Sequence, residues 1–376
     1  TIIFFDLIFP QSKIGASING KFLNIDFHEV VMEGALCFLL FAGALHIDFN
    51  LLVKKRYAIL SLATLSIIIS TILIGLGIFY IGQFIGLNIP IIFSLLFGAL
   101  ISPTDPVAVL SLLKSMKNVP DTLRVKIAGE SLFNDGVGIV LFAVILNIAI
   151  SSSTNTGIDL NYIQVLEFFF LETFGGITLG LITGFIAYKA LKKIDDYALE
   201  VLITLSLVMG TYTIALMLHV SGPLAVVIAG LLIGNFATRM AMSPTTRNYL
   251  NIFWLIIDEI LNAGLFILIG IEVMSLTFSN LNILAALIAI PLVLLARIIS
   301  VSIPISILGL KRDFTKGAIP ILTWGGMKGA ISVALALSIP DIPIREPILF
   351  MTYSVVMFSI VIQGLSIKKL IGLVLK

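Results

Sequence analysis

The chain has 376 residues, of which 59% are hydrophobic and only 12% are charged, and its formal net charge is +2. A soluble domain carries about 25% charged residues, and the deficit in this chain extends from end to end. The composition therefore excludes an ordinary soluble protein and indicates a polytopic membrane protein. One cysteine and three histidines without a shared spacing give no sign of a disulfide or of a bound transition metal.

The apolar stretches are long enough to cross a bilayer and are joined by short connections. A membrane-spanning helix needs about 20 mostly apolar residues. No connection is long enough to hold a soluble domain, so residues 1–376 are expected to form a single all-α transmembrane domain. In chain order we expect a short apolar piece at 1–9 and spans at roughly 29–47, 57–86, 90–116, 125–150, 161–188, 197–218, 221–237, 249–275, 282–308, 315–338 and 347–372.

The lysines and arginines alternate between the two sides of these spans. One set of connections holds only Lys13, Lys21 and Arg345. An excess of positive charge marks the cytoplasmic side of a membrane protein. The other set is therefore expected to be cytoplasmic, and the C-terminus with it. That set holds positive residues at 54–56, 114–126, 189–193, 239–247, 311–316 and 368–376.

Two of the expected spans, 90–116 and 315–338, are interrupted near their middles. The interrupting residues are Pro103 and Pro106 in the first span and Gly325, Gly326 and Gly329 in the second. Proline removes a backbone donor from a helix, and glycine tolerates unwound backbone. A matched pair of broken helices in the two halves of a membrane protein points to a transport site. The first span ends and the second begins on the cytoplasmic side, so they run in opposite directions, as an inverted repeat requires.

Three carboxylates fall inside spans close to the first break. Asp105 belongs to Ser-Pro-Thr-Asp-Pro (102–106), whereas Glu130 and Asp135 belong to Gly-Glu-Ser-Leu-Phe-Asn-Asp (129–135). Acidic side chains near the middle of a bilayer are costly and usually handle ions or protons. A desolvated carboxylate is stable either when it is protonated or when it holds a cation. Competition between those two states is enough to exchange a cation for a proton.

A hard monovalent cation prefers oxygen ligands, and this region offers several. Residues spaced i, i+4 share a helix face, so Ser131 lies beside Asp135, and Glu130 lies beside Asn134. Broken helices also free backbone carbonyls for ion binding. The oxygens expected to surround the cation belong to the side chains of Asp105, Ser131 and Asp135 and to the backbone carbonyl of Thr104.

Two positive residues lie inside spans and need counter-charges. The guanidinium of Arg297 cannot be neutralised by deprotonation, and Glu130 is its leading partner because the other two acids serve the ion. Lys328 either compensates the helix ends at the second break or pairs with a carboxylate. The acids Asp258 and Glu259 either line a cytoplasmic funnel or pair with the arginines at the preceding helix end.

The motifs of this chain resemble those of the Na+/H+ exchanger branch of the monovalent cation:proton antiporters, which includes bacterial and archaeal exchangers and their animal relatives. They occur in the family's order and cover about residues 29–372. The combination of Asp-Pro with Asn-Asp is quite specific. The matching motifs are Ser-Pro-Thr-Asp-Pro-Val-Ala-Val (102–109), Gly-Glu-Ser-Leu-Phe-Asn-Asp (129–135), Gly-Pro-Leu-Ala-Val-Val-Ile-Ala-Gly (222–230), Leu-Ala-Arg (295–297) and Gly-Gly-Met-Lys-Gly-Ala-Ile-Ser (325–332).

The resemblance implies an inverted-repeat antiporter fold with two crossing discontinuous helices, a core domain and a dimerisation domain. The ion-binding core would comprise about 57–150 and 282–338, and the remainder would be mainly dimerisation or scaffold helices. Homodimers in the cell membrane are implied as well. The family's first helix and part of its next one have no counterpart before residue 1, which leaves open a truncated sequence or a divergent N-terminus.

The resemblance also implies roles for individual residues. Asp135 would bind the cation and the proton in turn, and Glu130 would pair with Arg297 and hold Asn134. Family members with asparagine at this last position are typically electroneutral. Lys328 departs from the family, which usually has arginine there, and lysine keeps the charge but loses the planar fork.

The expected function is secondary-active exchange of Na+ or Li+ for H+ by alternating access, in a one-to-one ratio. A K+/H+ antiporter of the same fold and a cation channel remain as alternatives. No enzymatic activity, resident cofactor or nucleic-acid partner is expected. The expected partners are monovalent cations, protons, the lipid bilayer and a second copy of the chain.

Overall fold

A computed structural model describes residues 34–105, 109, 113, 120–153, 162–272, 278–309 and 317–374. Almost all of these residues are helical, and among them seven helices are long and apolar enough to cross a membrane. The prediction of an all-α polytopic membrane protein is therefore confirmed. The apolar piece expected at 1–9 and the beginning of the span expected at 29–47 lie outside the described residues.

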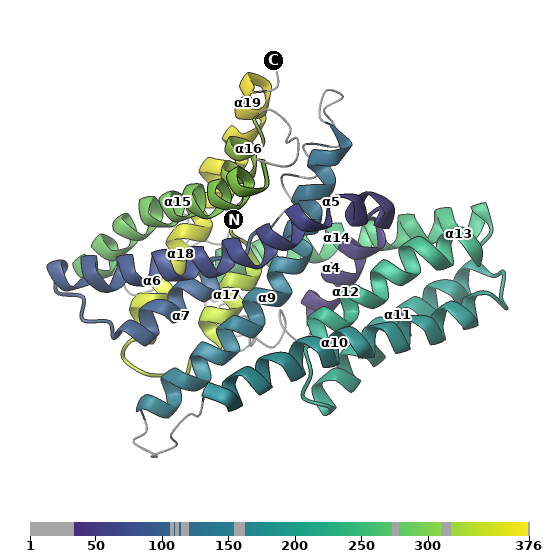
Figure 1. Cartoon of the computed structure of the whole chain (residues 1–376), viewed down its shortest axis with the longest axis horizontal. Coiled ribbons are helices and arrows are strands. Elements are labelled where there is room, and N and C mark those ends of the chain that lie inside the picture. The colour runs from purple at the N-terminus through teal and green to yellow at the C-terminus, as the bar shows by residue number, and fades with distance from the viewer. Residues whose placement is uncertain are drawn as a thin grey trace, which may run out of the picture.

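Figure 1 shows the helices in chain order, and within the described residues they correspond to the spans expected from the sequence; most of the second half of the span expected at 90–116 lies outside those residues. The span expected at 221–237 ends in a π-helical turn, and so does the first part of the span expected at 347–372. The helices are α4 (Leu36–Leu45), α5 (Phe49–Ala63), α6 (Leu65–Ile85), α7 (Ile91–Ile101), α9 (Asp121–Ser153), α10 (Tyr162–Leu191), α11 (Tyr197–Met217), α12 (Gly222–Leu232), η2 (Ile233–Ala237), α13 (Thr238–Met240), α14 (Pro244–Glu272), α15 (Asn280–Gly309), α16 (Ala318–Trp324), α17 (Ala330–Leu337), α18 (Arg345–Phe358), η4 (Ser359–Gln363) and α19 (Gly364–Val374).

One helix begins well ahead of the apolar span expected for it. The sequence predicts a span that begins near residue 57, but helix α5 begins at Phe49 and runs through the positive residues at 54–56. The cause is Asp48, whose carboxylate accepts hydrogen bonds from the backbone N–H groups of Asn50 (2.8 Å) and Leu51 (3.2 Å). This N-cap starts the helix ahead of the apolar stretch.

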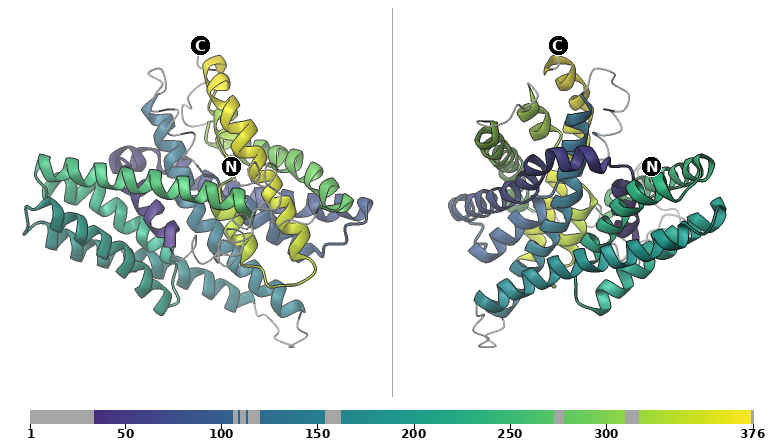
Figure 2. Two further views of the ribbon diagram at one scale, coloured as in Figure 1. Left: turned by 180° about the vertical axis from the view of Figure 1, so that it is seen from behind. Right: turned by 45° about the vertical axis from the view of Figure 1, so that its right-hand side comes forward.

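The helices form two packed groups, which Figures 1 and 2 show from three directions. Helices α4, α10, α11, α12 and α14 surround a core that includes Phe41, Val208 and Trp254. Helices α6, α7, α15, α17 and α18 contribute to a second core that includes Phe97 and Val333. Helix α9 contacts both groups and therefore lies at their boundary.

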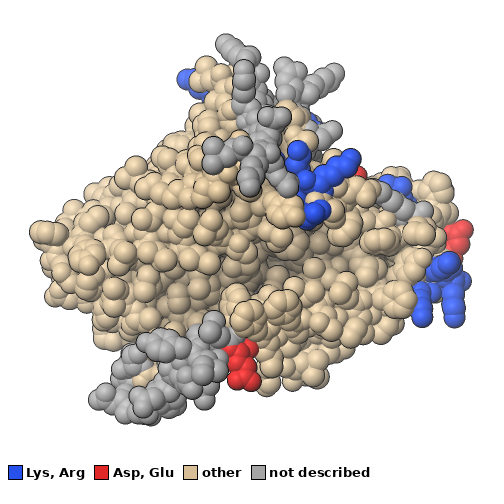
Figure 3. Space-filling model, in the orientation of Figure 1, with Lys and Arg blue, Asp and Glu red and all other residues tan. Residues whose placement is uncertain are grey.

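The outside of the bundle is largely apolar. Large hydrophobic side chains are exposed on several helices, among them Phe84 on α6, Phe174 on α10, Ile267 on α14 and Leu287 on α15. Figure 3 shows one face on which charged side chains gather toward the margins and a broad uncharged area lies between them. Soluble monomers rarely expose apolar patches larger than a few hundred Å², so this surface agrees with a position inside a bilayer.

Candidate ion-binding site

The two interrupted helices cross at their breaks. Helix α7 ends at Ile101, and the chain then leaves helical geometry through Thr104 and Asp105. The second break separates α16 from α17 and contains Met327. The backbone N–H of Asp105 donates to the carbonyl of Met327 over 2.8 Å, and the two residues form an isolated antiparallel bridge. The expected crossing of two discontinuous helices is therefore present; Pro106, the second proline of the first break, lies outside the described residues.

Lys328 satisfies backbone groups at this crossing. Its side-chain ammonium donates to the carbonyls of Ser102 (2.9 Å) and Pro103 (3.2 Å), and the residue is 3% exposed. The C-terminal end of a helix carries partial negative charge and unpaired carbonyls. Lys328 therefore compensates the end of α7, which belongs to the first break. Lys328 was expected either to compensate the helix ends at the second break or to pair with a carboxylate, and it acts at the first break because the two breaks cross.

A buried ion pair joins α9 to α15. Nη2 of Arg297 lies 2.6 Å from Oε1 of Glu130, and both side chains are almost fully enclosed. The same nitrogen donates to the backbone carbonyl of Leu322 near the end of α16, over 3.2 Å. A side chain at Gly326 would collide with the guanidinium, because an added Cβ would lie 2.9 Å from its Cζ atom. Arg297 thus links three helices around the second break.

Thr104 is held by two residues of α9. The amide of Asn134 donates to the Thr104 hydroxyl over 2.8 Å, and the Thr104 backbone N–H donates to the amide oxygen of Asn134 over 3.4 Å. The Ser131 hydroxyl donates to the Thr104 carbonyl. The resemblance implied that Glu130 holds Asn134, but in the structure Thr104 does so, because the Glu130 carboxylate is drawn to Arg297.

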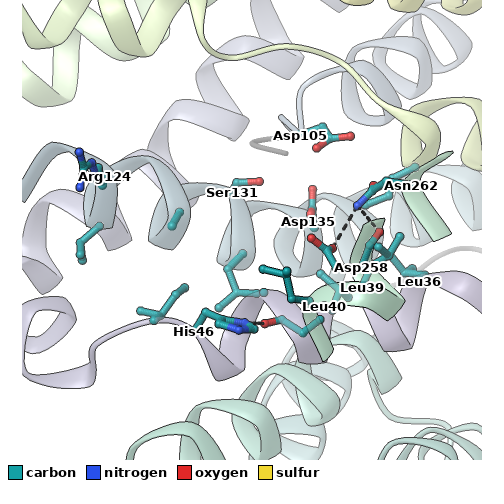
Figure 4. Close-up of a pocket in the computed structure, with 18 of the residues that line it drawn as sticks. Leu36, Leu39, Leu40, His46, Asp105, Arg124, Ser131, Asp135, Asp258 and Asn262 are labelled. Atoms are coloured by element: carbon teal, nitrogen blue, oxygen red, sulfur yellow. Dashed lines mark hydrogen bonds between the residues drawn. The ribbon is translucent and has the colours of Figure 1, made fainter. Parts of the chain in front are cut away.

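A cavity of about 370 Å³ lies between α4, α9, α14 and α17, and Asp105, Ser131 and Asp135 reach it together. Figure 4 shows these three side chains grouped on one side of the cavity. Asp135 is 6% exposed, and its carboxylate makes no hydrogen bond within the described part of the chain. Asp105 is partly exposed and lies against Gly329. The cavity therefore ends on two carboxylates and a hydroxyl.

These groups offer oxygen ligands of the kind that a cation prefers. The two carboxylates supply negative charge, and the hydroxyl of Ser131 still has lone pairs to offer after donating to Thr104. The neighbouring positive groups are each occupied, Lys328 by carbonyls and Arg297 by Glu130. Neither is expected to displace a cation from Asp135, so the arrangement leaves that carboxylate available to a cation or a proton.

Comparisons with known proteins identify the family. A family model described as the transmembrane domain of sodium/hydrogen exchangers matches residues 4–372. The chain belongs to the sodium/hydrogen exchanger family. It is 46% identical to the Na(+)/H(+) antiporter NhaP of Pseudomonas aeruginosa, over 93% of this chain and 82% of that protein. It is 34% identical to the Na(+)/H(+) antiporter NhaH of Halobacillus dabanensis, over 92% of this chain and 83% of that protein.

The fold of this family member also matches that of a solved structure. The sodium proton antiporter MjNhaP1 of Methanocaldococcus jannaschii superposes with a TM-score of 0.74, covering 93% of this chain and 87% of that one, at 23% sequence identity. At that identity the likeness concerns the fold alone. The antiporter fold class predicted from the sequence is therefore confirmed, as is the recognition of the exchanger family.

Two features of the exchanger's site were not predicted. The first is the pairing of Thr104 with Asn134, for which the sequence gives no signal beyond their places beside the break and in the Asn-Asp motif. The second is the presence of Asn262 in the wall of the cavity beside Asp258, for which a place in a funnel or beside the arginines of the preceding helix end was expected. Their i, i+4 spacing in an apolar stretch predicts that they share a helix face, but not that this face meets the site.

Proposed function

We propose that this protein is a secondary-active antiporter that exchanges Na+ or Li+ for H+ at Asp135 by alternating access. The observation that carries the proposal is the position of that carboxylate, buried at the end of a cavity beside Asp105 and Ser131 and without a hydrogen-bond donor in the described part of the chain. Such a group is stable when it is protonated or when a cation neutralises it. The names of the relatives that share 46% and 34% identity support the same activity.

Exchange follows from competition at one group. A cation that enters the cavity takes the place of the proton on Asp135, with Asp105, Ser131 and the Thr104 carbonyl as further oxygen ligands. After the core has moved, the cation leaves on the other side and a proton takes its place. Each passage therefore carries either a cation or a proton, and the gradients of the two ions drive the cycle.

The ratio of the exchange depends on the charges that travel with the site. Asn134 is neutral, and Arg297 is held by Glu130 and by the carbonyl of Leu322. Because no further charge has to be gained or lost at the site, one cation is exchanged for one proton. The transport cycle is then electroneutral.

The proposal extends to the assembly and its orientation. The core would comprise about 57–150 and 282–338, and the remaining helices would form the scaffold of a homodimer in the cell membrane. The positive residues at 54–56 and 368–376 are expected on the cytoplasmic side. The C-terminus would then be cytoplasmic. The two packed groups of helices around separate cores support such a division.

Proteoliposomes that contain a pH-sensitive dye test the activity. Addition of Na+ or Li+ should dequench the dye, and the response should persist when the membrane potential is clamped. A response to K+ alone would replace the proposal with K+/H+ exchange. Cation flux without proton movement would identify a channel, and the absence of any response to alkali cations would refute the antiporter.

The Asn134→Asp variant tests the proposed ratio. The added carboxylate should form no ion pair with Arg297, because Glu130 already holds that guanidinium at 2.6 Å. The variant is therefore expected to exchange ions without net current. Recordings on a solid-supported membrane measure this directly, and a sustained Na+-induced current in the variant would contradict the one-to-one ratio.

The Gly329→Ala variant tests the position of Asp105. An added Cβ at Gly329 would lie 2.8 Å from the Cγ atom of Asp105, so this carboxylate must move away. Displacing a ligand by such an amount is expected to raise the KM for Na+ at least about tenfold. The matched control is Gly210→Ala, because an added Cβ there meets no atom within 4 Å. Equal KM values in the two variants would show that Asp105 does not contact the cation.

A further inference from the structure

One carboxylate of the cavity belongs to the opposite helix group. Asp258 lies on α14, 14 residues beyond the start of that helix at Pro244, which places it about 21 Å along the helix axis and close to its middle. It lines the same cavity as Asp105 and Asp135. Figure 4 shows Asp258 on the same side of the view as Asp135, with Asn262 bonded to it. An acid at this depth is costly, and this one lines the cavity of the proposed ion site.

Asn262 fixes the Asp258 side chain. Its amide nitrogen donates to Oδ1 of Asp258 over 3.0 Å and to the Asp258 backbone carbonyl over 2.8 Å. Asn262 is 8% exposed, so these bonds are shielded from solvent. An amide is a neutral donor, so it orients the carboxylate without adding a positive charge of its own.

The rest of the described cavity wall is largely apolar. Most of its side chains are leucine, isoleucine, valine and alanine. Figure 4 shows Arg124, another residue of the described wall, at the other end of the view from Asp258. Asp135 itself is nine-tenths buried and has no hydrogen-bond partner in the described residues. Asp258 thus faces the same cavity as Asp105 and Asp135, and a cation among these carboxylates would relieve their mutual repulsion.

We propose that Asp258 is a cation-contacting residue of this transport site, which shares the ion with Asp135 while the cavity is open and so raises the affinity for the cation. The proposal rests on the cation–proton exchange proposed above. In the proposed division of the chain, α14 belongs to the scaffold and α9 to the core. Asp258 therefore stays behind when the core moves, and the contact helps the cation to bind without travelling with it.

The test is the Asp258→Asn variant, assayed in proteoliposomes by Na+ uptake that an outward-directed proton gradient drives. Asparagine keeps the size of the side chain and its contact with Asn262 but removes the charge. The KM for Na+ is expected to rise about tenfold, which is the scale of one lost contact with a partly screened charge. The maximal rate should stay within about twofold of the wild-type value, because the exchanging group at Asp135 is untouched. Asp258→Glu should restore most of the affinity.

Glu259→Gln is the matched control, since Glu259 is the neighbouring acid on α14, is exposed and does not line the cavity. It should keep the wild-type KM. An unchanged KM in Asp258→Asn would overturn the proposal, and so would an equal rise in Glu259→Gln, which would point to a general effect of negative charge. A fall in maximal rate alone would mean that Asp258 is only structural.

The failure of this inference differs from the failure of the proposed function. If the wild-type protein exchanges Na+ for H+ but Asp258→Asn has the same KM, only the role of Asp258 is refuted. If the wild-type protein exchanges no cation, the proposed function fails. The binding of Na+ is then measured by its effect on thermal unfolding. Na+ should raise the unfolding temperature of the wild type more than that of Asp258→Asn, and equal shifts would again refute the role of Asp258.

Discussion

The Asp135→Asn variant is expected to lose cation–proton exchange altogether. Asparagine has nearly the same shape but carries no charge, and its amide neither binds nor releases a proton at the pH of a transport assay. Asp135 is buried in the wall of the cavity, and the substitution removes the group for which cation and proton compete in the proposed cycle. Dye dequenching in proteoliposomes should fall at least about 100-fold, below detection, a scale typical of removing a group that the reaction itself requires.

The control for this experiment removes an acid elsewhere. Asp341 lies in the loop before α18 and is almost fully exposed, and the Asp341→Asn variant should exchange ions at the wild-type rate. Both variants should elute as folded protein and unfold at a temperature close to that of the wild type. Residual exchange in Asp135→Asn at more than a tenth of the wild-type rate would place the exchanging carboxylate elsewhere.

The Glu130→Gln variant is expected to destabilise the protein strongly. Arg297 would keep its positive charge in a buried position, because a guanidinium does not lose its proton in proteins. Leaving one partner of a buried ion pair uncompensated costs about 3–5 kcal/mol. The unfolding temperature of the purified protein in detergent should fall by several degrees, and the yield of folded protein should fall with it.

Two further variants separate this effect from a general sensitivity to charge. Arg297→Met combined with Glu130→Gln removes both charges and should recover much of the lost stability, because no unpaired charge remains. Asp341→Asn breaks the pair with Arg345, which is 3.8 Å long and exposed, and should change stability little. If the double variant were less stable than Glu130→Gln alone, the explanation by an uncompensated charge would be wrong.

Much of this fold is predictable because membrane helices obey simple rules. Apolar length gives the spans, and proline and glycine mark where a span must break. The partner of Arg297 follows from the cost of an unpaired charge, since few acids lie at membrane depth. In each of these cases a single physical requirement determines the arrangement, and the residue types alone are enough to predict it.

Other features depend on how elements meet in space. Lys328 acts on the end of α7, because the second break lies over the first, and spacing along the chain does not show this. Asn134 pairs with Thr104 for the same reason. Asp258 reaches the cavity because α14 packs beside α17, an arrangement that no pattern within α14 reveals. Helix α5 begins at Phe49, ahead of the apolar span expected at 57–86, because Asp48 caps its first turn.

Proton release on cation binding tests the central claim most directly. Purified protein in detergent and weak buffer, at a pH where Asp135 is protonated, would be mixed with Na+ in the presence of an indicator dye. Binding of Na+ should release about one proton per chain, because the two ions compete for the same carboxylate, and Asp135→Asn should release none. Binding of Na+ without proton release by the wild type, or equal release by Asp135→Asn, would contradict the account.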